Sequence, residues 1–292
     1  MKITIADKAG FCFGVERAEN IVLSTIKNKK NKVYTFGPLI HNPIVVKKLK
    51  ELGVFPVEEE DLQKLDKNST IIIRSHGIEK KTLIKLEKMG FDIVDATCPF
   101  VKKAKESAKT LYEKNYNLII LGDINHPEVK GIHSYTDYNG VILKDTDELK
   151  TYLKEKNNRV GLVAQTTQSK ELFEEFVSIM QEKATDICIF DTICNATSSR
   201  QLSAIKLAEK SDVIIVIGGF NSANTKRLVE ICNKICKNVI WIEKTEDLEL
   251  EQLDCYEKIG ITAGASTPVK SIEETSQIIQ NYYNGKVNKN DE

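Results

Sequence analysis

Short apolar runs and longer amphipathic runs alternate along the whole chain. Runs such as LIILG and VIIVIG have the length of buried strands, whereas KKTLIKLEKMG and KELFEEFVSIM place their apolar residues at helical spacing. Strands that alternate with helices in this way predict parallel or mostly parallel sheets covered by helices on both faces. The hydrophobic pattern therefore predicts an α/β fold.

The alternation repeats three times. Each repeat starts from a strand-like run, a small loop and a cysteine, continues into a helix-like stretch, and reaches an apolar strand that ends in glycine. The cysteines are Cys12, Cys98 and Cys194. The glycines Gly37, Gly122 and Gly218 follow them by 25, 24 and 24 residues. Such regular spacing in a chain without low-complexity sequence indicates three related structural repeats.

The repeats predict domain boundaries near residues 97 and 193. We expect α/β repeats at 1–97, 98–193 and 194–281, and a disordered tail at 282–292. Each repeat also contains an acidic helix start, EEEDLQKL, DTDELKTYL or KTEDLELEQL. Three αβα repeats around a pseudo-threefold axis, a cloverleaf, would turn the loops at the carboxyl ends of their strands toward one centre. The alternative is three repeats that share no centre.

Composition excludes several classes of function. Forty-two basic and 42 acidic residues balance, so nothing in the sequence indicates a nucleic-acid-binding surface. No apolar run is long enough to cross a membrane, and the first residues lack the pattern of a signal peptide. We therefore expect a cytoplasmic protein.

The seven cysteines are then informative, because structural disulfides are rare in a reducing compartment. We expect Cys188, Cys232, Cys236 and Cys255 to be small buried hydrophobic residues. Three converging thiolates from the repeats suit either zinc or an iron–sulfur cluster. The absence of CxxC pairs and the wide separation favour a cuboidal [4Fe–4S] cluster with one iron free of protein thiolates, while zinc stays an alternative.

Polar residues stand at equivalent strand ends in the three repeats. They are His41, His76, His126, Thr166, Ser222, Asn224 and Ser266. Several stand just before a helix, where each taken alone would be an ordinary cap. Together, imidazoles and converging helix N-termini would bind a compact polyanion such as diphosphate. Glu128 could be a first-turn helix charge or a proton relay helped by Thr166, and its position alone favours neither.

Eight separated motifs together resemble one family. AGFCFGVERA, GPLIHNP, RSHG, DATCPFV, HPEVKG, AQTTQS, GGFNSANT and TAGASTP are similar to those of the 4-hydroxy-3-methylbut-2-enyl diphosphate reductases, from residue 3 to about residue 280. The resemblance implies a three-part α/β cloverleaf around one [4Fe–4S] cluster. It also implies reductive dehydroxylation of the allylic diphosphate, by two electrons and with loss of water, to isopentenyl and dimethylallyl diphosphate.

The resemblance further implies roles for single residues. Cys12, Cys98 and Cys194 would bind the cluster, and Glu128 would be the proton donor with Thr166 supporting it. The substrate would be bound by His41, His76, His126, Thr166, Ser222, Asn224 and Ser266. Electrons would come from ferredoxin or flavodoxin. Ala223 departs from the family, which commonly has serine there, so we expect slightly weaker substrate binding.

Two other classes of cluster protein compete with this interpretation. A quinolinate synthase-like dehydratase would also use three cysteines, but HPE followed by AQTTQS favours the reductase. A non-enzymatic iron–sulfur sensor would need an output surface such as a DNA-binding helix or a basic patch, and the neutral chain indicates neither.

Overall fold

The structure is a computed structural model that describes residues 1–154 and 159–290. Its strands are β1 (Lys2–Ile5), β2 (Val33–Phe36), β3 (Phe55–Val57), β4 (Thr70–Ile73), β5 (Asp92–Asp95), β6 (Asn117–Leu121), β7 (Val141–Leu143), β8 (Arg159–Ala164), β9 (Asp186–Ile189), β10 (Val213–Ile217), β11 (Val239–Ile242) and β12 (Lys258–Ala263). Its α-helices are α1 (Phe13–Asn28), α2 (Pro43–Glu51), α3 (Lys80–Lys88), α4 (Pro99–Glu113), α5 (Pro127–Ser134), α6 (Thr146–Tyr152), α7 (Lys170–Lys183), α8 (Asn195–Ala208), α9 (Ala223–Asn233) and α10 (Val269–Asn290). Among these described residues, no helix has both the length and the apolar character needed to span a membrane.

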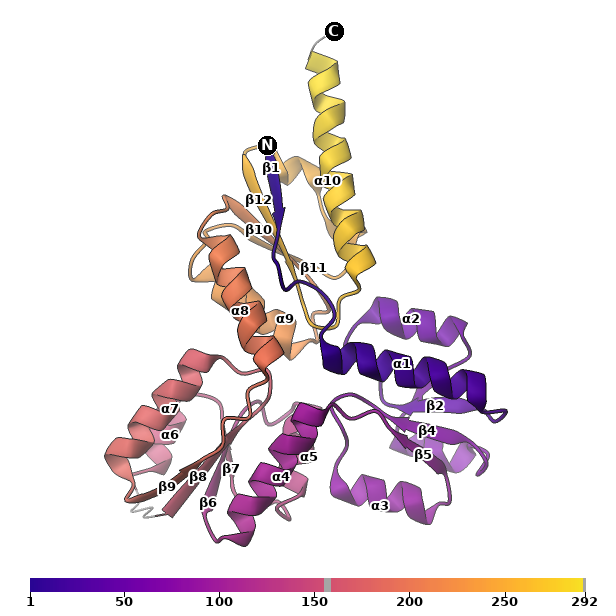
Figure 1. The fold of residues 1–292 in the computed structure, drawn as a ribbon, viewed down its shortest axis with the longest axis vertical. Helices are drawn as coiled ribbons and strands as arrows, with labels where there is room; N and C mark the ends of the chain where they lie inside the picture. Colours follow the sequence, from indigo (N-terminus) through magenta and orange to yellow (C-terminus); the bar gives the residue numbers. More distant parts are fainter. Residues whose placement is uncertain (155–158, 291–292) are drawn as a thin grey trace. The chain divides into compact units, whose positions relative to one another are not determined.

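The strands form three parallel four-stranded sheets with one topology (Figure 1). The orders are β3-β2-β4-β5, β7-β6-β8-β9 and, written in the same sense, β11-β10-β12-β1. In every sheet the strand that ends near the repeat's glycine pairs with the next two strands of the same repeat, one on each side. The predicted α/β class and the threefold repeat are confirmed.

The fourth strand of each sheet leads into the next cysteine. β5 and β9 precede Cys98 and Cys194, and β1 precedes Cys12. Because β1 pairs with β12, with Lys2 opposite Lys258, residues 2–5 belong to the sheet of the third repeat rather than to that of the first. The boundaries at residues 97 and 193 otherwise stay a prediction.

Contacts divide the chain into two compact units, which are described separately below. One unit comprises Met1–Phe13, His41–Lys48 and Ala196–Glu292, and we call it the terminal unit. The other comprises Gly14–Ile40 and Leu49–Asn195, and we call it the central unit. The third sheet lies in the terminal unit, and the first two sheets lie in the central unit.

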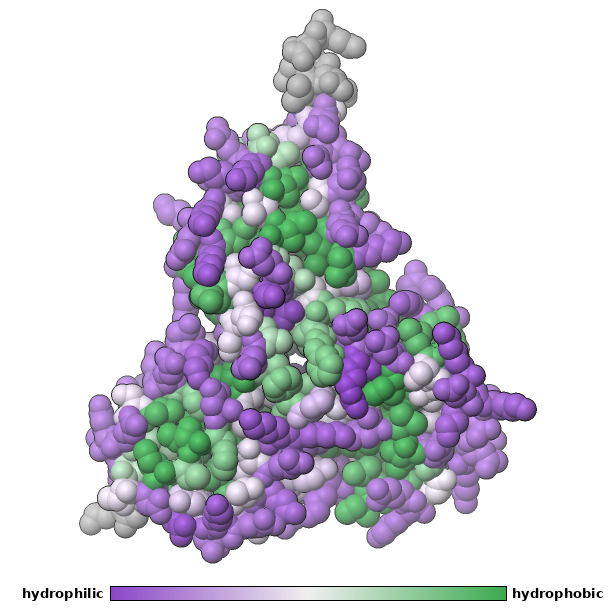
Figure 2. Space-filling view, in the orientation of Figure 1, coloured by the Kyte–Doolittle hydropathy of each residue, from purple (hydrophilic) through white to green (hydrophobic). Residues whose placement is uncertain are grey.

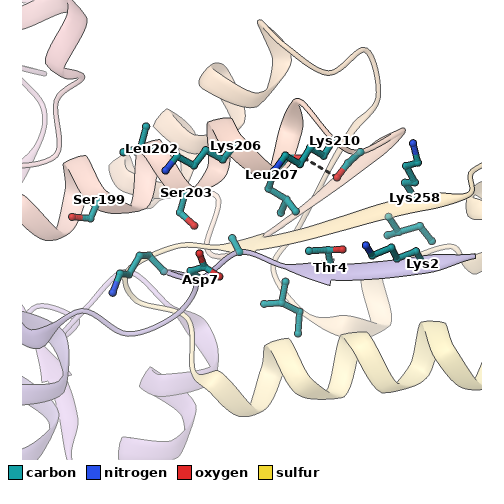
Figure 3. Close-up of a pocket in the computed structure, with 15 residues that line it drawn as sticks. Lys2, Thr4, Asp7, Ser199, Leu202, Ser203, Lys206, Leu207, Lys210 and Lys258 are labelled. Carbon is teal, nitrogen blue, oxygen red and sulfur yellow. Dashed lines mark hydrogen bonds between the residues drawn. The ribbon is translucent and has the colours of Figure 1, made fainter.

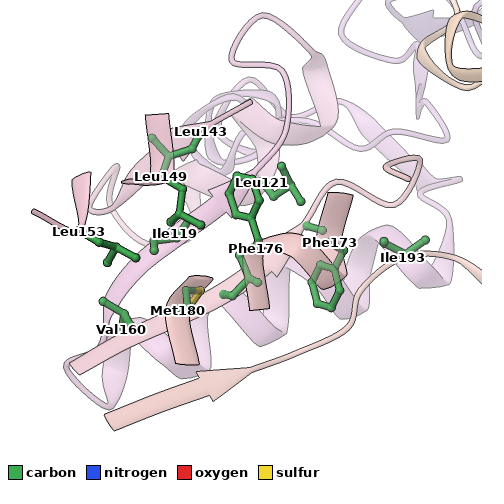
Figure 4. Close-up of a cluster of buried hydrophobic side chains, with 12 residues drawn as sticks. Ile119, Leu121, Leu143, Leu149, Leu153, Val160, Phe173, Phe176, Met180 and Ile193 are labelled. Carbon is green, nitrogen blue, oxygen red and sulfur yellow. The ribbon is translucent and has the colours of Figure 1, made fainter. Parts of the chain in front are cut away.

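Alternate residues of the middle strands bury their side chains on opposite faces of the sheets. Ile119 and Leu121 of β6 pack against Phe173, Phe176 and Met180 of α7, in the cluster drawn in Figure 4. The intervening residues of β6 instead pack against α4 and α5 on the other face. A strand covered on both faces has to be apolar throughout, which explains the continuous hydrophobic runs of the sequence.

Two details of the sequence prediction are wrong. The expected disordered tail forms the end of α10, where the hydroxyl of Tyr282 donates to Asp254; residues 291–292 lie outside the described part of the chain. Of the three acidic helix starts, only the second forms an α-helix, α6. The first and third form short 3₁₀ turns, such as Glu59–Lys64, which bury Leu62 while the acidic side chains stay in water.

Candidate active site

The three repeat cysteines have the same backbone setting. Each stands directly before a helix, α1, α4 or α8, and its thiol is half-buried. The amide of Cys12 donates to the carbonyl of Ala265 at 3.1 Å, that of Cys98 to Ser75 at 2.9 Å and that of Cys194 to Thr166 at 3.0 Å. Each acceptor lies two residues beyond the end of the third strand of its sheet, β12, β4 or β8. The fold thus places three thiols equivalently at helix N-termini, where an anionic group is stabilised.

Two arginines, Arg17 (half-buried) and Arg200 (buried), hold the loops beside these cysteines. In the central unit, Nη1 of Arg17 on α1 donates to the carbonyl of Thr97, next to Cys98, at 3.2 Å. In the terminal unit, Nη2 of Arg200 on α8 donates to the carbonyl of Gly10, two residues before Cys12, at 2.6 Å. Sequence analysis missed both arginines. A basic residue five to seven positions after each repeat cysteine, which includes Lys105, is the signal that would have found them.

The other four cysteines divide as follows. Cys232 and Cys236 are buried in the core against α8 and β10, and Cys188 is a half-buried member of the core around β6, as expected. Cys255 is exposed, so its predicted burial is wrong: it lies in the turn before β12 rather than on a core strand. None of the seven, all within the described residues, forms a disulfide.

Glu128 is a fully buried carboxylate in the first turn of α5, with 1% of its surface exposed. The backbone N–H of Thr166 donates to its Oε1 at 2.6 Å, and the hydroxyl of Thr166 donates to its Oε2 at 3.0 Å. Because the carbonyl of Thr166 also accepts from the amide of Cys194, one residue connects this carboxylate to a repeat cysteine.

Burial raises the pKa of Glu128 to about 7, against an ordinary value of 4.5. The two hydrogen bonds from Thr166 and the charge of Lys105 oppose this rise, since they favour the ionised form. A carboxyl group with a pKa near neutrality holds a proton for part of the time and releases it readily, which suits a general acid.

Two of the predicted histidines lie beside this acid in the central unit. His126 caps α5, and its Nδ1 accepts from the amide of Glu128 at 3.2 Å. The ring of His76 meets the ring of His126 edge to face, with centroids 5.3 Å apart. The structure therefore brings His76, His126, Glu128 and Thr166 together.

Lys105 is a buried cation near this cluster. Its Nζ donates to the carbonyl of Ile78 at 2.9 Å and lies 4.9 Å from the centre of the Tyr135 ring. Gly77, the residue after His76, has a φ of 71°, and a Cβ there would lie 2.6 Å from Nζ and 3.2 Å from Thr97, so another residue would be strained at this position. Burial lowers the pKa of Lys105 to about 8, while the charges of Asp95 and Glu128 raise it.

The remaining predicted residues lie in the terminal unit. The Ser266 hydroxyl donates to the carbonyl of His41 at 3.4 Å, and that carbonyl also lies 2.6 Å from where a Cβ of Gly219 would be. Glycine at position 219 therefore lets two predicted binding loops approach each other closely. Ser222 caps α9 by accepting from the amide of Thr225, as its sequence position predicted.

Two buried asparagines in this unit each carry an amide nitrogen with no partner. They are Asn224, 6% exposed, and Asn42, 2% exposed, which caps α2 through Oδ1. Buried donors without a partner are costly and therefore point to a ligand. Asn42 was missed in the sequence because His41 beside it has the same spacing from its glycine as His126 and Ser222 have from theirs.

Comparison with known proteins identifies the family. A family model described as LytB protein matches residues 3–280. The chain belongs to the LytB family. A LytB relative from Caldanaerobacter subterraneus subsp. tengcongensis, named 4-hydroxy-3-methylbut-2-enyl diphosphate reductase, is 44% identical over 96% of this chain and 97% of its own. The protein of the same name from Aquifex aeolicus is 43% identical over 98% of both chains.

Solved LytB structures agree with the fold. A structure of (E)-4-hydroxy-3-methyl-but-2-enyl diphosphate reductase, described as the terminal enzyme of the non-mevalonate pathway, is 43% identical, covers 96% of this chain and 99% of its own, and has a TM-score of 0.69. The corresponding reductase from Plasmodium falciparum is 29% identical, covers 94% and 87%, and has a TM-score of 0.87. LytB membership selects the reductase over the dehydratase and the sensor.

Proposed function

We propose that this LytB chain reduces (E)-4-hydroxy-3-methylbut-2-enyl diphosphate to isopentenyl and dimethylallyl diphosphate. Two electrons and two protons replace the C4 hydroxyl by hydrogen and release it as water. Relatives of this name match nearly the whole chain and are themselves matched over nearly their whole length, which supports one shared activity. The observation that carries the proposal is the Glu128–Thr166 pair, in which Thr166 also accepts a hydrogen bond from the amide of Cys194.

The cofactor of the proposal is one [4Fe–4S] cluster bound by Cys12, Cys98 and Cys194. The residues fit such a cluster. The three cysteines have half-buried thiols at equivalent helix N-termini, and the backbone amide of each donates a hydrogen bond to a carbonyl just beyond a strand end. Thiolates are the ordinary ligands of such clusters, and the positive helix ends suit an anionic group. When bound, the cluster would supply the electrons and a Lewis-acidic iron.

Glu128 would provide a proton to the departing hydroxyl. The proton is available at neutral pH because burial raises the pKa of this carboxyl to about 7. Thr166 fixes the carboxylate with two hydrogen bonds, so the acid has one orientation rather than several. Such positioned proton transfer contributes about 10²- to 10⁴-fold to a rate.

The diphosphate would be bound by groups that donate hydrogen bonds. In the terminal unit these are the Asn224 and Asn42 amides, the hydroxyls of Ser222 and Ser266, and His41. In the central unit His76 and His126 would add imidazole donors next to the acid. An anion would also be stabilised at the N-terminus of α9, which Ser222 caps.

Ferredoxin or flavodoxin would supply the electrons, and the enzyme would work in the cytoplasm. Thiols that are to bind iron have to stay reduced, which a reducing compartment provides.

Anaerobic purification followed by iron and sulfide analysis tests the cofactor. Cys12→Ser, Cys98→Ser and Cys194→Ser should each lose iron and activity. Cys255→Ser, which removes an exposed thiol, is the matched control and should keep both. Retention of a full cluster by any of the three variants would contradict its ligand role.

Turnover with a strong chemical reductant and the allylic diphosphate tests the activity separately. Mass spectrometry should detect both isoprenoid diphosphates. A cluster-loaded protein that forms neither product would overturn the proposed activity.

A further inference from the structure

A groove runs along the edge of the sheet in the terminal unit, between β1 and α8. Its volume is about 710 Å³, and its lining comes from β1, the loop after it, one face of α8, and the start of β12. Ser199, Ser203 and Lys206 follow one another at four- and three-residue spacing, so they share one side of α8, and Lys210 continues the row in the turn after the helix. Figure 3 shows this row facing Lys2 and Thr4 of β1 across the groove.

The groove is strongly basic although the whole chain has no net charge. Its lining contains five lysines and a single acidic residue, Asp7. The lysines are Lys2, Lys8, Lys206, Lys210 and Lys258. All five are exposed, and among the described residues none of them forms an ion pair. The chain therefore has a locally positive surface although its total charge is balanced. Lysines without ion-pair partners can attract an acidic partner to this surface.

Apolar side chains lie among these charges. Leu202 of α8 is 52% exposed and Ile5 of β1 is 40% exposed, and both line the groove. Figure 2 shows hydrophobic surface over β1 with hydrophilic side chains along both sides of it. An apolar centre with a charged rim is the usual composition of a protein–protein interface.

One end of the groove lies close to a proposed cluster ligand. Lys8 precedes Cys12 by four residues, so even a fully extended chain would separate their Cα atoms by no more than about 14 Å. Arg200, on the helix that forms the other wall, donates to the carbonyl of Gly10 and fixes this loop against α8. A redox centre held at this end would therefore have a short path to Cys12.

We propose that the groove between β1 and α8 is the docking surface for a small acidic electron-transfer protein, which reduces the cluster through the Cys12 side. The proposal rests on the proposed function, since it concerns the delivery of the two electrons of each turnover. The donor leaves oxidised, and the electrons pass on to the allylic substrate.

The spread of the charges favours a protein over a small anion. Ser199 and Lys206 stand seven residues apart on α8, which corresponds to about 10 Å along the helix. Lys2 and Ile5 are separated by a similar distance along β1, about 10 Å. A single phosphate would reach only one or two of these lysines, whereas the acidic face of a folded donor could contact most of them.

Charge reversal tests the docking surface in the full-length, cluster-loaded protein. The variant Lys206→Glu/Lys210→Glu changes one lysine of α8 and one in the turn after it, and leaves the edge strand intact. Lys150→Glu/Lys183→Glu, two exposed lysines of the central unit, is the matched control with the same net charge. Turnover is measured with a reduced acidic ferredoxin and, separately, with a reduced viologen, which needs no docking surface.

At low ionic strength the groove variant should lose at least about tenfold in kcat/KM for ferredoxin, because electrostatic steering contributes about 10- to 10³-fold to association. Its rate with viologen should equal that of the unchanged protein, and the control should match the unchanged protein with both donors. Binding of oxidised ferredoxin, measured by calorimetry, should weaken in the same variant only.

If the groove variant used and bound ferredoxin as well as the unchanged protein does, the docking proposal would be overturned. Turnover with viologen would in that case still support the proposed activity. Absence of viologen turnover in the unchanged protein would instead overturn the activity, and the calorimetry would then decide on docking alone. Binding of a DNA duplex, but not of ferredoxin, through these lysines would assign the groove to nucleic acid and refute the proposal.

Discussion

Replacing Glu128 with glutamine tests whether the reaction needs the proton of this side chain or only its shape. Glutamine keeps an oxygen that accepts from the amide of Thr166, but it neither titrates nor donates an acidic proton. We expect Glu128→Gln to lower kcat by about 10²- to 10⁴-fold, the usual contribution of a positioned general acid. In the unchanged enzyme the rate should fall as pH rises through about 7, since only the protonated carboxyl can act.

The same substitution should change stability in a defined direction with pH. The pKa of Glu128 is about 7 in the folded protein and 4.5 ordinarily, so the folded state binds this proton more tightly. That stabilisation is complete below about pH 4.5 and is lost as pH rises through 7. A shift of this size corresponds to about 3 kcal/mol in total, of which about 2 kcal/mol falls between about pH 5.5 and about pH 8.

Thermal unfolding of the holoprotein across that range measures the effect. The unchanged protein should lose stability relative to Glu128→Gln as pH rises, because glutamine carries no such dependence. Glu171→Gln, an exposed change on α7, should follow the unchanged protein at every pH. Parallel curves for the unchanged protein and Glu128→Gln would refute the raised pKa, and an unchanged kcat would refute the proton donor.

Three further substitutions test the surroundings of this acid and the diphosphate site. Thr166→Val removes one hydrogen bond to the ionised carboxyl, so the alkaline limb of the rate profile should move to higher pH; an unmoved limb would count against the contact. Lys105→Met removes a charge that lowers the same pKa and should move the limb in the same direction, whereas Lys103→Met, exposed on the same helix, should not. Ala223→Ser should lower the KM for the diphosphate about two- to tenfold at constant kcat, the value of one neutral hydrogen bond, and an equal or higher KM would disprove it.

The spacing between the cysteines and the glycines was enough to predict the repeat, because the backbone has the same course in all three repeats. Cys12, Cys98 and Cys194 stand at equivalent places in it, and the three sheets have the same strand order. The place of β1 could not be deduced from the pattern, since an apolar strand carries no information about which neighbour it will pair with. Its pairing with β12 depends on the route of the whole chain.

The main omission was three cations that are buried or half-buried. Arg17, Lys105 and Arg200 resemble ordinary charged positions of amphipathic helices, and most such residues face water. Here their targets are backbone carbonyls of distant loops, at separations of 80 and 190 residues for the two arginines. Because a carbonyl is present at every residue, no sequence motif marks the acceptor, and only the folded chain reveals the pairing.

The three repeats share their backbone contacts but differ in their side-chain contacts, so some positions have the same residue type in every repeat and others do not. The position two residues past the third strand offers its carbonyl to a cysteine amide in all three sheets, whether it is Ser75, Thr166 or Ala265. A carbonyl does not depend on the side chain, so this contact leaves the residue type free to vary. Of these three residues, only Thr166 also donates a hydrogen bond to a carboxylate, that of Glu128, so this carboxyl group belongs to the second repeat alone. The proposed reaction would use three equivalent thiols but only one proton donor, and a threefold backbone with unequal side chains would meet both requirements.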